Sequence, residues 1–176
     1  MIGAVVMNFT MAAFIKRSFF IAGLLTSGLA LPVPSMGALA FDRASTKSMN
    51  LDKSGVAIRG FDPVAYFTDA KATKGNAQIF ATYQGATFYF ASTKNRGLFL
   101  KEPEKFLPAF GGFCAMGAAL KKKFDGDPNL WRIVEGKLYL NKDVPAERYW
   151  LKDVSGNITK ANDGWSSIKD RAPKDL

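Results

Sequence analysis

The chain has 176 residues, with 24 Lys and Arg against 15 Asp and Glu, one cysteine and no histidine, and this length is typical of a single domain. Without histidine it can form neither a Ser-His-Asp triad, nor a Cys-His pair, nor a His-ligated zinc site, and a single cysteine excludes an intramolecular disulfide. The net charge of +9 favours anionic partners in general but specifies no fold.

Residues 1–40 predict a cleavable export signal. Lys16 and Arg17 form a basic patch ahead of an apolar run over residues 19–31. As a helix this run would span about 20 Å, which is shorter than the roughly 30 Å core of a bilayer. Residues 38–40 (ALA) then match the small-x-small pattern at which signal peptidases cut. We therefore expect a periplasmic or secreted protein with no membrane span after cleavage.

Two details of this leader stay open. Translation can start at Met1 or Met11, and export can follow the general secretory or the twin-arginine route. Residues 41–55 are polar and mixed in character, so we expect a flexible lead-in there. Residues 56–170 are then expected to form the domain.

Two hairpins are predicted from turn chemistry. Gln84-Gly85 and Glu135-Gly136 each supply a glycine where a two-residue turn needs a positive φ. The first hairpin is expected to pair Ala81 with Phe88 and Ile79 with Phe90 on the core face, and Thr82 with Thr87 and Phe80 with Tyr89 on the other. The second is expected to pair Ile133 with Leu138 and Trp131 with Leu140, with Arg132 and Tyr139 on the opposite face.

Helices are expected between and after the hairpins. Ser92 can cap a helix to about Leu100, which Pro103 stops or restarts. Asp143 before Val144-Pro145 predicts another helix start. The predicted buried stripes are Ala146, Tyr149, Trp150 and Val154, then, after a break at Gly156, Ile158, Ala161, Trp165 and Ile168. The order predicts an α+β fold: a small single domain with two antiparallel β-hairpins, an intervening helix and C-terminal helices.

Several segments resemble the YHS domain. They are residues 60–67 (GFDPVAYF), 83–92 (YQGATFYFAS) and 103–106 (PEKF). Residues 111–115 and 136–141 also resemble segments of exported bacterial YHS-domain proteins, so the resemblance covers about residues 56–165. It implies the fold and, more weakly, a role in metal handling, particularly of copper.

The metal ligands that the resemblance implies are replaced in this chain. The three cysteine positions of the family motifs correspond to Ala65, Ala91 and Asn95. A methyl group cannot ligate a metal, and an amide is a poor substitute for thiolate at a soft-metal site. The resemblance therefore implies a scaffold without its defining ligands.

Cys114, in the segment GGFCAMG over residues 111–117, has two interpretations. Its thiolate and the Met116 thioether could form a weak copper(I) site, and a helix start at the glycines would lower the thiol pKa. Alternatively, Cys114 is a small core residue. We favour the core interpretation, because free cysteine is commonly buried and two sulfurs make a thin coordination shell.

Tyr66, Phe80 and Tyr89 are, with Cys114, the candidate ligand-binding residues. The three aromatic side chains could line a small apolar pocket in which a hydroxyl fixes the orientation of a ligand. They could equally form a core edge covered by the C-terminal helices, and the sequence does not separate the two.

The remaining charged motifs predict ordinary structure. Lys121-Lys122-Lys123 is expected on a solvated face or at a helix end, and we expect no nucleic-acid partner. Asp125 and Asp127 predict an Asx-type turn before the second hairpin, because a calcium loop needs more oxygen ligands. Asp62 before Pro63 predicts a helix cap or a turn.

These patterns favour a noncatalytic binding or accessory module of the cell envelope. Its expected partner is an unknown small ligand or an envelope protein, and the alternative is residual copper binding through Cys114 and Met116. An enzyme with Cys114 as nucleophile is disfavoured, because no histidine can serve as its base.

Overall fold

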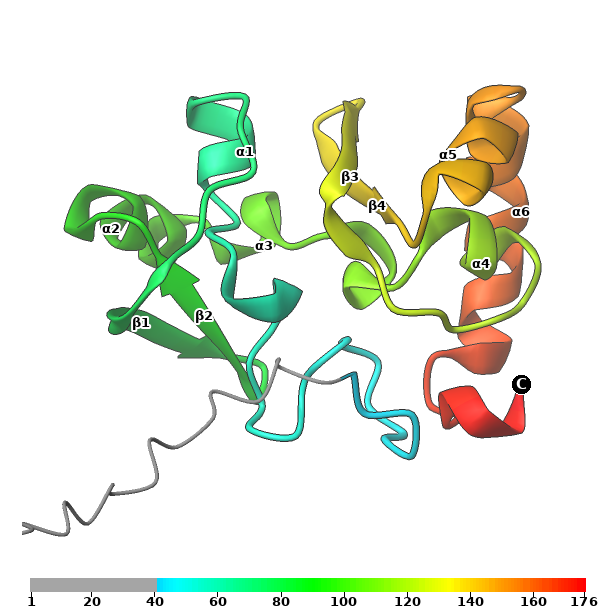
Figure 1. Cartoon of the computed structure of the whole chain (residues 1–176), viewed down its shortest axis with the longest axis horizontal. Coiled ribbons are helices and arrows are strands. Elements are labelled where there is room, and N and C mark those ends of the chain that lie inside the picture. Colours follow the sequence, from blue (N-terminus) through cyan, green and yellow to red (C-terminus); the bar gives the residue numbers. More distant parts are fainter. Residues whose placement is uncertain (1–40) are drawn as a thin grey trace, which may run out of the picture. The chain divides into compact units, whose positions relative to one another are not determined.

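The structure is a computed structural model that describes residues 41–176 (Figure 1). The predicted export signal, residues 1–40, lies outside the described residues. Over 41–176, no helix is both long enough and apolar enough to span a membrane.

Hairpins and helices alternate along the chain as predicted. In order, the elements are η1 (Ile58–Gly60), α1 (Ala65–Thr68), β1 (Asn76–Tyr83), β2 (Ala86–Phe90), α2 (Thr93–Lys101), α3 (Pro103–Phe106), η2 (Ala109–Gly112), α4 (Ala115–Ala119), β3 (Asp127–Val134), β4 (Lys137–Asn141), α5 (Val144–Leu151), α6 (Val154–Ile168) and η3 (Pro173–Asp175). Strands β1 and β2 form one two-stranded antiparallel sheet, and β3 and β4 form another. The predicted α+β class with two hairpins is confirmed.

The first hairpin has the predicted turn but a different register at its open end. Gln84 and Gly85 both have a positive φ, 48° and 73°, as the tight primed turn requires. The pairs Phe80–Tyr89, Ala81–Phe88 and Thr82–Thr87 are confirmed. The predicted Ile79–Phe90 pair is wrong, because the register shifts and Phe90 lies opposite Asn76. Within this shift, the Asn76 side chain accepts a hydrogen bond from the Gln78 N–H at 2.9 Å, a local bond that competes with the ladder.

The second hairpin forms in the predicted register. Its pairs are Trp131–Leu140, Arg132–Tyr139 and Ile133–Leu138, and Glu135 and Gly136 have φ values of 49° and 72°. Successive side chains of β4 point to opposite faces. As a result Leu138 and Leu140 join one core cluster, whereas Tyr139 joins another.

The apolar interior is divided into these two clusters. The first core lies around the β1–β2 hairpin and α2, and its largest side chains include Tyr66, Phe88, Phe90, Phe99, Phe106, Leu138 and Leu140. The second core lies among η2, β4 and helices α4 to α6, and it consists of Phe110, Ala115, Ala118, Tyr139, Trp150 and Ala161. Strand β4 contributes side chains to both clusters, so it lies between the first core and the second core.

The helix caps explain where the helices begin. The Ser92 side chain accepts from the Asn95 N–H at 3.1 Å and starts α2, as predicted. The Asp143 carboxylate accepts from the Ala146 N–H at 2.8 Å and starts α5, also as predicted. Pro103 begins a separate short helix, α3.

Two expectations for the C-terminal helices are wrong. Tyr149 is 61% exposed and not part of the buried stripe, because one residue of helix rotates it away from buried Trp150. The break lies before Gly156, since α5 ends at Leu151 and Asp153 caps α6. The Asp153 carboxylate accepts from the Gly156 N–H at 2.9 Å, which places Gly156 in the first turn of α6.

The segment expected as a lead-in packs on the domain at residues 49–52, which are buried. Asn50 donates its backbone N–H to the Gly111 carbonyl at 2.8 Å and its side-chain amide to the Gly112 carbonyl at 3.2 Å. These contacts place the N-terminal part of the domain against the turn that precedes α4.

Candidate functional site

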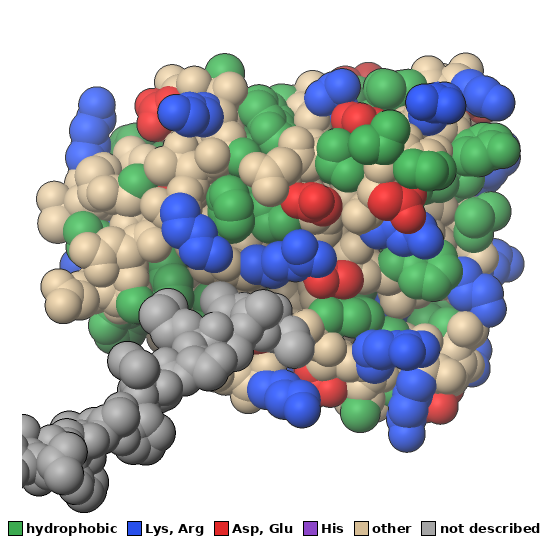
Figure 2. All heavy atoms as spheres, in the orientation of Figure 1, with side chains coloured by type: hydrophobic (Ala, Val, Ile, Leu, Met, Phe, Trp, Pro, Cys, Tyr) green, Lys and Arg blue, Asp and Glu red, His purple; other side chains and the backbone are tan. Residues whose placement is uncertain are grey.

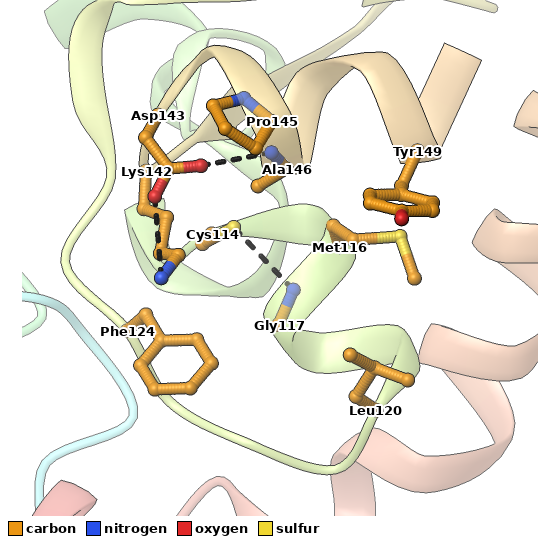
Figure 3. A pocket seen from close by; sticks show the side chains of 10 residues that line it. All are labelled: Cys114, Met116, Gly117, Leu120, Phe124, Lys142, Asp143, Pro145, Ala146 and Tyr149. Carbon is orange, nitrogen blue, oxygen red and sulfur yellow. Dashed lines mark hydrogen bonds and ion pairs between the residues drawn. The ribbon is translucent and has the colours of Figure 1, made fainter.

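A cavity of about 470 Å³ opens beside α4 and α5. Figure 3 shows its lining, which is Cys114, Met116, Gly117, Leu120, Phe124, Lys142, Asp143, Pro145, Ala146 and Tyr149. Most of these side chains are apolar, and its volume lies in the range of small-molecule sites. We call this space the apolar cavity.

The turn ahead of α4 requires glycine. Phe110, Gly111 and Gly112 all have a positive φ, and a Cβ on Gly111 would overlap the backbone of Ser48. This turn delivers Cys114 to the N-cap of α4, where its backbone N–H donates to the Phe124 carbonyl at 2.9 Å. The glycines therefore position the wall of the apolar cavity and form no phosphate loop of their own.

Cys114 is a buried thiol. Its Sγ accepts from the Gly117 N–H at 3.4 Å and donates to the Asn141 side-chain oxygen at 3.7 Å. Burial raises the pKa of Cys114, and this effect outweighs the Gly117 N–H and the nearby Lys142 cation, which both lower it. The lowering of the thiol pKa that the copper interpretation invoked is outweighed, because desolvation exceeds the effect of the short helix.

The two sulfurs of the candidate copper pair line the same cavity but do not converge. Figure 3 shows the Met116 thioether directed toward Tyr149 and away from the Cys114 sulfur. In the part of the chain that the structure describes, no group of three or more His, Cys, Asp or Glu side chains could hold a metal.

One ion pair lies at the edge of the apolar cavity. Lys142 Nζ lies 3.2 Å from Asp143 Oδ2 and 4.7 Å from the centre of the Phe124 ring. The Ala146 N–H and then Lys142 lower the pKa of Asp143, so this carboxylate is charged at neutral pH. Because Asp143 also caps α5, it fixes the position of Lys142 at the cavity edge.

Three large apolar side chains at the rim of the apolar cavity are exposed to solvent. Leu120 is 60% exposed and Tyr149 is 61% exposed, and Phe124 is exposed as well. The sequence predictions missed Leu120, Phe124 and Lys142. Leu120 and Phe124 stand directly on either side of the lysine run. Large apolar residues next to several charges in a loop were the sequence signal that could have indicated an exposed apolar surface there.

The structure separates the aromatic candidates. Tyr66 is buried in the first core, donates its hydroxyl to the Pro128 carbonyl at 3.0 Å and packs edge-on against Trp131. Phe80 is 51% exposed and lines a groove of about 390 Å³ that includes neither Tyr66 nor Tyr89. Tyr89 is half-buried opposite Phe80 in the hairpin. Cys114, the fourth candidate, lies in the apolar cavity instead.

Ala65, Ala91 and Asn95, which correspond to the cysteine positions of the motifs that the chain resembles, lie around a buried carboxylate. Asp62 is fully buried, and its Oδ2 accepts from the Ala91 N–H at 2.8 Å and from the Asn95 side-chain amide at 2.7 Å. Its Oδ1 accepts from the Val64 N–H at 2.8 Å, which confirms the predicted cap or turn. N–H donors therefore surround the carboxylate, and donors of this kind repel a cation.

Lys123 is buried, unlike the solvated lysine run that the sequence predicted. It is 2% exposed, and its ammonium donates to the carbonyls of Lys47, Lys169 and Arg171 at 2.8–2.9 Å. It also lies 4.6 Å from the centre of the Phe113 ring. Lys121 and Lys122 are exposed as expected, but Lys123 joins the lead-in to the C-terminal end of the chain.

The two aspartates of the loop before β3 have different roles. Asp127 Oδ1 accepts from the Asn129 N–H at 2.9 Å, which confirms the predicted turn. Asp125 instead forms an ion pair with Arg59 and accepts from the Asn50 side chain at 2.8 Å. This tie to the N-terminal part of the domain had no signal in the local sequence, because its partners are distant along the chain.

Comparison with known proteins gives one family match. The family model of the YHS domain matches residues 64–110. Neither the curated proteins nor the solved structures gave a match. The matched segment contains α1, the first hairpin, α2 and α3, whereas the residues that line the apolar cavity all follow it.

Proposed function

We propose that this chain is an exported, noncatalytic YHS-type binding module of the cell envelope, and that a small ligand occupies the apolar cavity. The observation that carries the proposal is the combination of a cavity of about 470 Å³ with an apolar lining and a single ion pair at its edge. Sites of this composition bind an apolar body and orient it with a few polar groups.

Burial of the rim would supply the affinity. Leu120 and Tyr149 present apolar surface to water, and each Å² that a ligand covers is worth about 25 cal/mol. Both side chains line the apolar cavity, so a ligand inside it would cover part of their exposed surface.

The state of the thiol supports a noncatalytic role. Burial keeps Cys114 protonated at neutral pH, and the chain has no histidine that could deprotonate it. A protonated thiol is a weak nucleophile. The apolar cavity therefore has recognition groups but no activated reacting group.

The test is a ligand screen read by thermal shift, with matched variants. We expect Leu120→Ala and Tyr149→Ala to reduce the affinity of a hit by about tenfold each while leaving the unfolding temperature nearly unchanged, because both side chains are exposed. Phe80→Ala is the control, since Phe80 is a similarly exposed apolar residue outside the apolar cavity. Hits that lose affinity only with Phe80→Ala would contradict the proposal.

Copper(I) binding through Cys114 and Met116 is the second candidate. It is favoured by the presence of both sulfurs in one cavity. It is opposed by the Lys142 ammonium, which is close enough to the thiol to affect its pKa and would repel a cation. Titration of Cu(I) into wild type and Cys114→Ala decides it, and equal affinity rejects the site.

The proposed export has its own test. If residues 1–40 are removed, protein isolated from the periplasm or medium begins at Phe41, and its intact mass shows this directly. A chain that keeps residues 1–40 would contradict the export proposal without affecting the proposed ligand site.

A further inference from the structure

A second cavity of about 490 Å³ lies beside the apolar cavity and differs from it in charge. Its lining is Phe41, Arg43, Arg59, Lys123, Phe124, Asp125, Lys142, Pro173, Lys174 and Leu176. Five of these side chains are cationic, and Asp125 is the acidic side chain among them. We call this space the basic cavity.

The cations of the basic cavity are not equally available. Arg59 is paired with Asp125, Lys142 with Asp143, and the Lys123 ammonium donates to three carbonyls. Arg43 and Lys174 are exposed and form no ion pair among residues 41–176. Their main chains are joined, because the Lys174 N–H donates to the Arg43 carbonyl at 3.1 Å. The basic cavity thus has two exposed cations on adjoining backbone segments, and neither forms an ion pair within the described part of the chain.

The two cavities share Phe124 and Lys142. Figure 3 shows both residues on one side of the apolar cavity, with the Lys142 ammonium beside Phe124. Figure 2 shows Lys and Arg side chains interspersed with apolar ones over α4 and the C-terminal segment. The apolar lining of the first cavity therefore continues directly into the cationic lining of the basic cavity.

On the premise of the proposed function, we propose that the ligand is a single-chain lipid with an anionic head group. Its chain lies in the apolar cavity against Leu120 and Tyr149. Its head group passes Lys142 and is bound by Arg43 and Lys174 in the basic cavity. Each half of this ligand matches the wall that it meets, because apolar area favours the chain and unpaired cations favour the anion.

Simpler ligands fit one cavity only. A free anion would contact Arg43 and Lys174 but leave Leu120 and Tyr149 exposed. A neutral apolar molecule would cover the apolar rim but leave the two cations unpaired. A single-chain anionic lipid uses both, which is why we assign this chemistry to the site.

The test uses lauroyl lysophosphatidylglycerol as the anionic probe, below its micelle concentration, with isothermal titration calorimetry on the purified protein. Lauroyl lysophosphatidylcholine is the probe with the same chain and no net charge, and glycerophosphoglycerol, a phosphodiester with one negative charge, is the head group without a chain. We expect the anionic probe to bind roughly tenfold tighter than the zwitterionic one, because two partly exposed charge contacts are worth about 0.2–1 kcal/mol each.

Variants separate the two halves of the ligand. Arg43→Gln with Lys174→Gln should remove the preference for the anionic probe, whereas Lys94→Gln with Lys160→Gln, an exposed pair elsewhere, should keep it. Tyr149→Ala should weaken both lauroyl probes by about tenfold. The anionic preference should also decrease with salt, since the contacts are exposed.

Each other outcome overturns the inference. If both lauroyl probes bind equally and the Arg43/Lys174 variant changes nothing, the head-group assignment is wrong, while the proposed apolar site stands. If glycerophosphoglycerol binds as tightly as the anionic lauroyl probe, the chain contributes nothing and the lipid assignment is wrong. Binding only to anionic vesicles and never to monomeric probe would make this face a membrane surface. If neither probe binds and Tyr149→Ala affects no screening hit, the proposed function fails as well.

Discussion

The first core and the second core differ in how the charged groups near them are paired and in how far these groups are exposed. In the first core, to which most of the segment matched by the YHS family model contributes, the Asp62 carboxylate, two residues before that segment, is enclosed by N–H donors of Val64, Ala91 and Asn95. In the second, the Lys142–Asp143 pair lies at the edge of an open apolar cavity. Polar groups beside the matched segment are thus paired internally, whereas the ion pair that follows it lies at an open cavity, which is where we propose that a ligand binds.

The largest effect on stability is expected from removing the Asp62 carboxylate and its buried hydrogen bonds in the first core. Asp62→Ala should lower the free energy of unfolding by about 3 kcal/mol or more, because it leaves several buried N–H donors without an acceptor. Urea denaturation measures this, and Asp163→Ala, an exposed aspartate of α6, is the control with little expected change. A loss below 1 kcal/mol for Asp62→Ala would mean that the network is dispensable.

The second expected effect concerns Lys123, the buried lysine whose ammonium joins the lead-in to the C-terminal segment. Burial lowers the pKa of Lys123 from its ordinary value of 10.5 to about 8. Between these values the folded chain has released a proton that the unfolded chain still binds, so the contribution of this group to stability rises with pH. Wild type should therefore gain about 2 kcal/mol relative to Lys123→Met between pH 7.5 and 9.5.

Burial raises the pKa of Tyr66, so this residue opposes the effect of Lys123 only at higher pH, where an unfolded tyrosine loses its proton. Urea unfolding at several pH values measures the difference between wild type and variant. Lys122→Met is the control, because that lysine is exposed. A difference that is flat or falls with pH would show that Lys123 keeps its ordinary pKa.

The smallest effect compares the two hairpin turns. Gln84 and Glu135 occupy the same position in turns of the same kind, each with a positive φ that disfavours their side chains. Gln84→Asn and Glu135→Asn should each stabilise the fold by roughly 0.5 kcal/mol, because asparagine tolerates this conformation and is preferred there. Thermal unfolding checks both, and destabilisation by either would show that its native side chain has an unrecognised contact.

Local signals predicted most of the fold. Turn glycines and alternation fixed both hairpins, and the caps Ser92 and Asp143 marked two helices. The Ile79–Phe90 pair failed because the register shifts between Asn76 and Phe80, where the Asn76 side chain also accepts a local hydrogen bond from the Gln78 N–H. Sequence patterns describe regular ladders, whereas such an irregularity depends on one side chain.

The site was less predictable, because distant residues build it. Cys114 was expected either in a core or in a site, and it proves to be a buried thiol that lines the apolar cavity. Leu120, Phe124 and Lys142 line one cavity only because the fold brings the end of α4 close to the end of β4. Lys123 was expected in solvent, and only the converging carbonyls of Lys47, Lys169 and Arg171 explain its burial.

The most direct test of the account is to map the bound probe on the amide resonances of the protein. Titration with lauroyl lysophosphatidylglycerol should shift the signals of residues 116–120 and 142–149, which form the apolar cavity, and leave those of Ala91 and Asn95 unchanged. Shifts centred on Ala91 and Asn95, with none along α4 and α5, would contradict it.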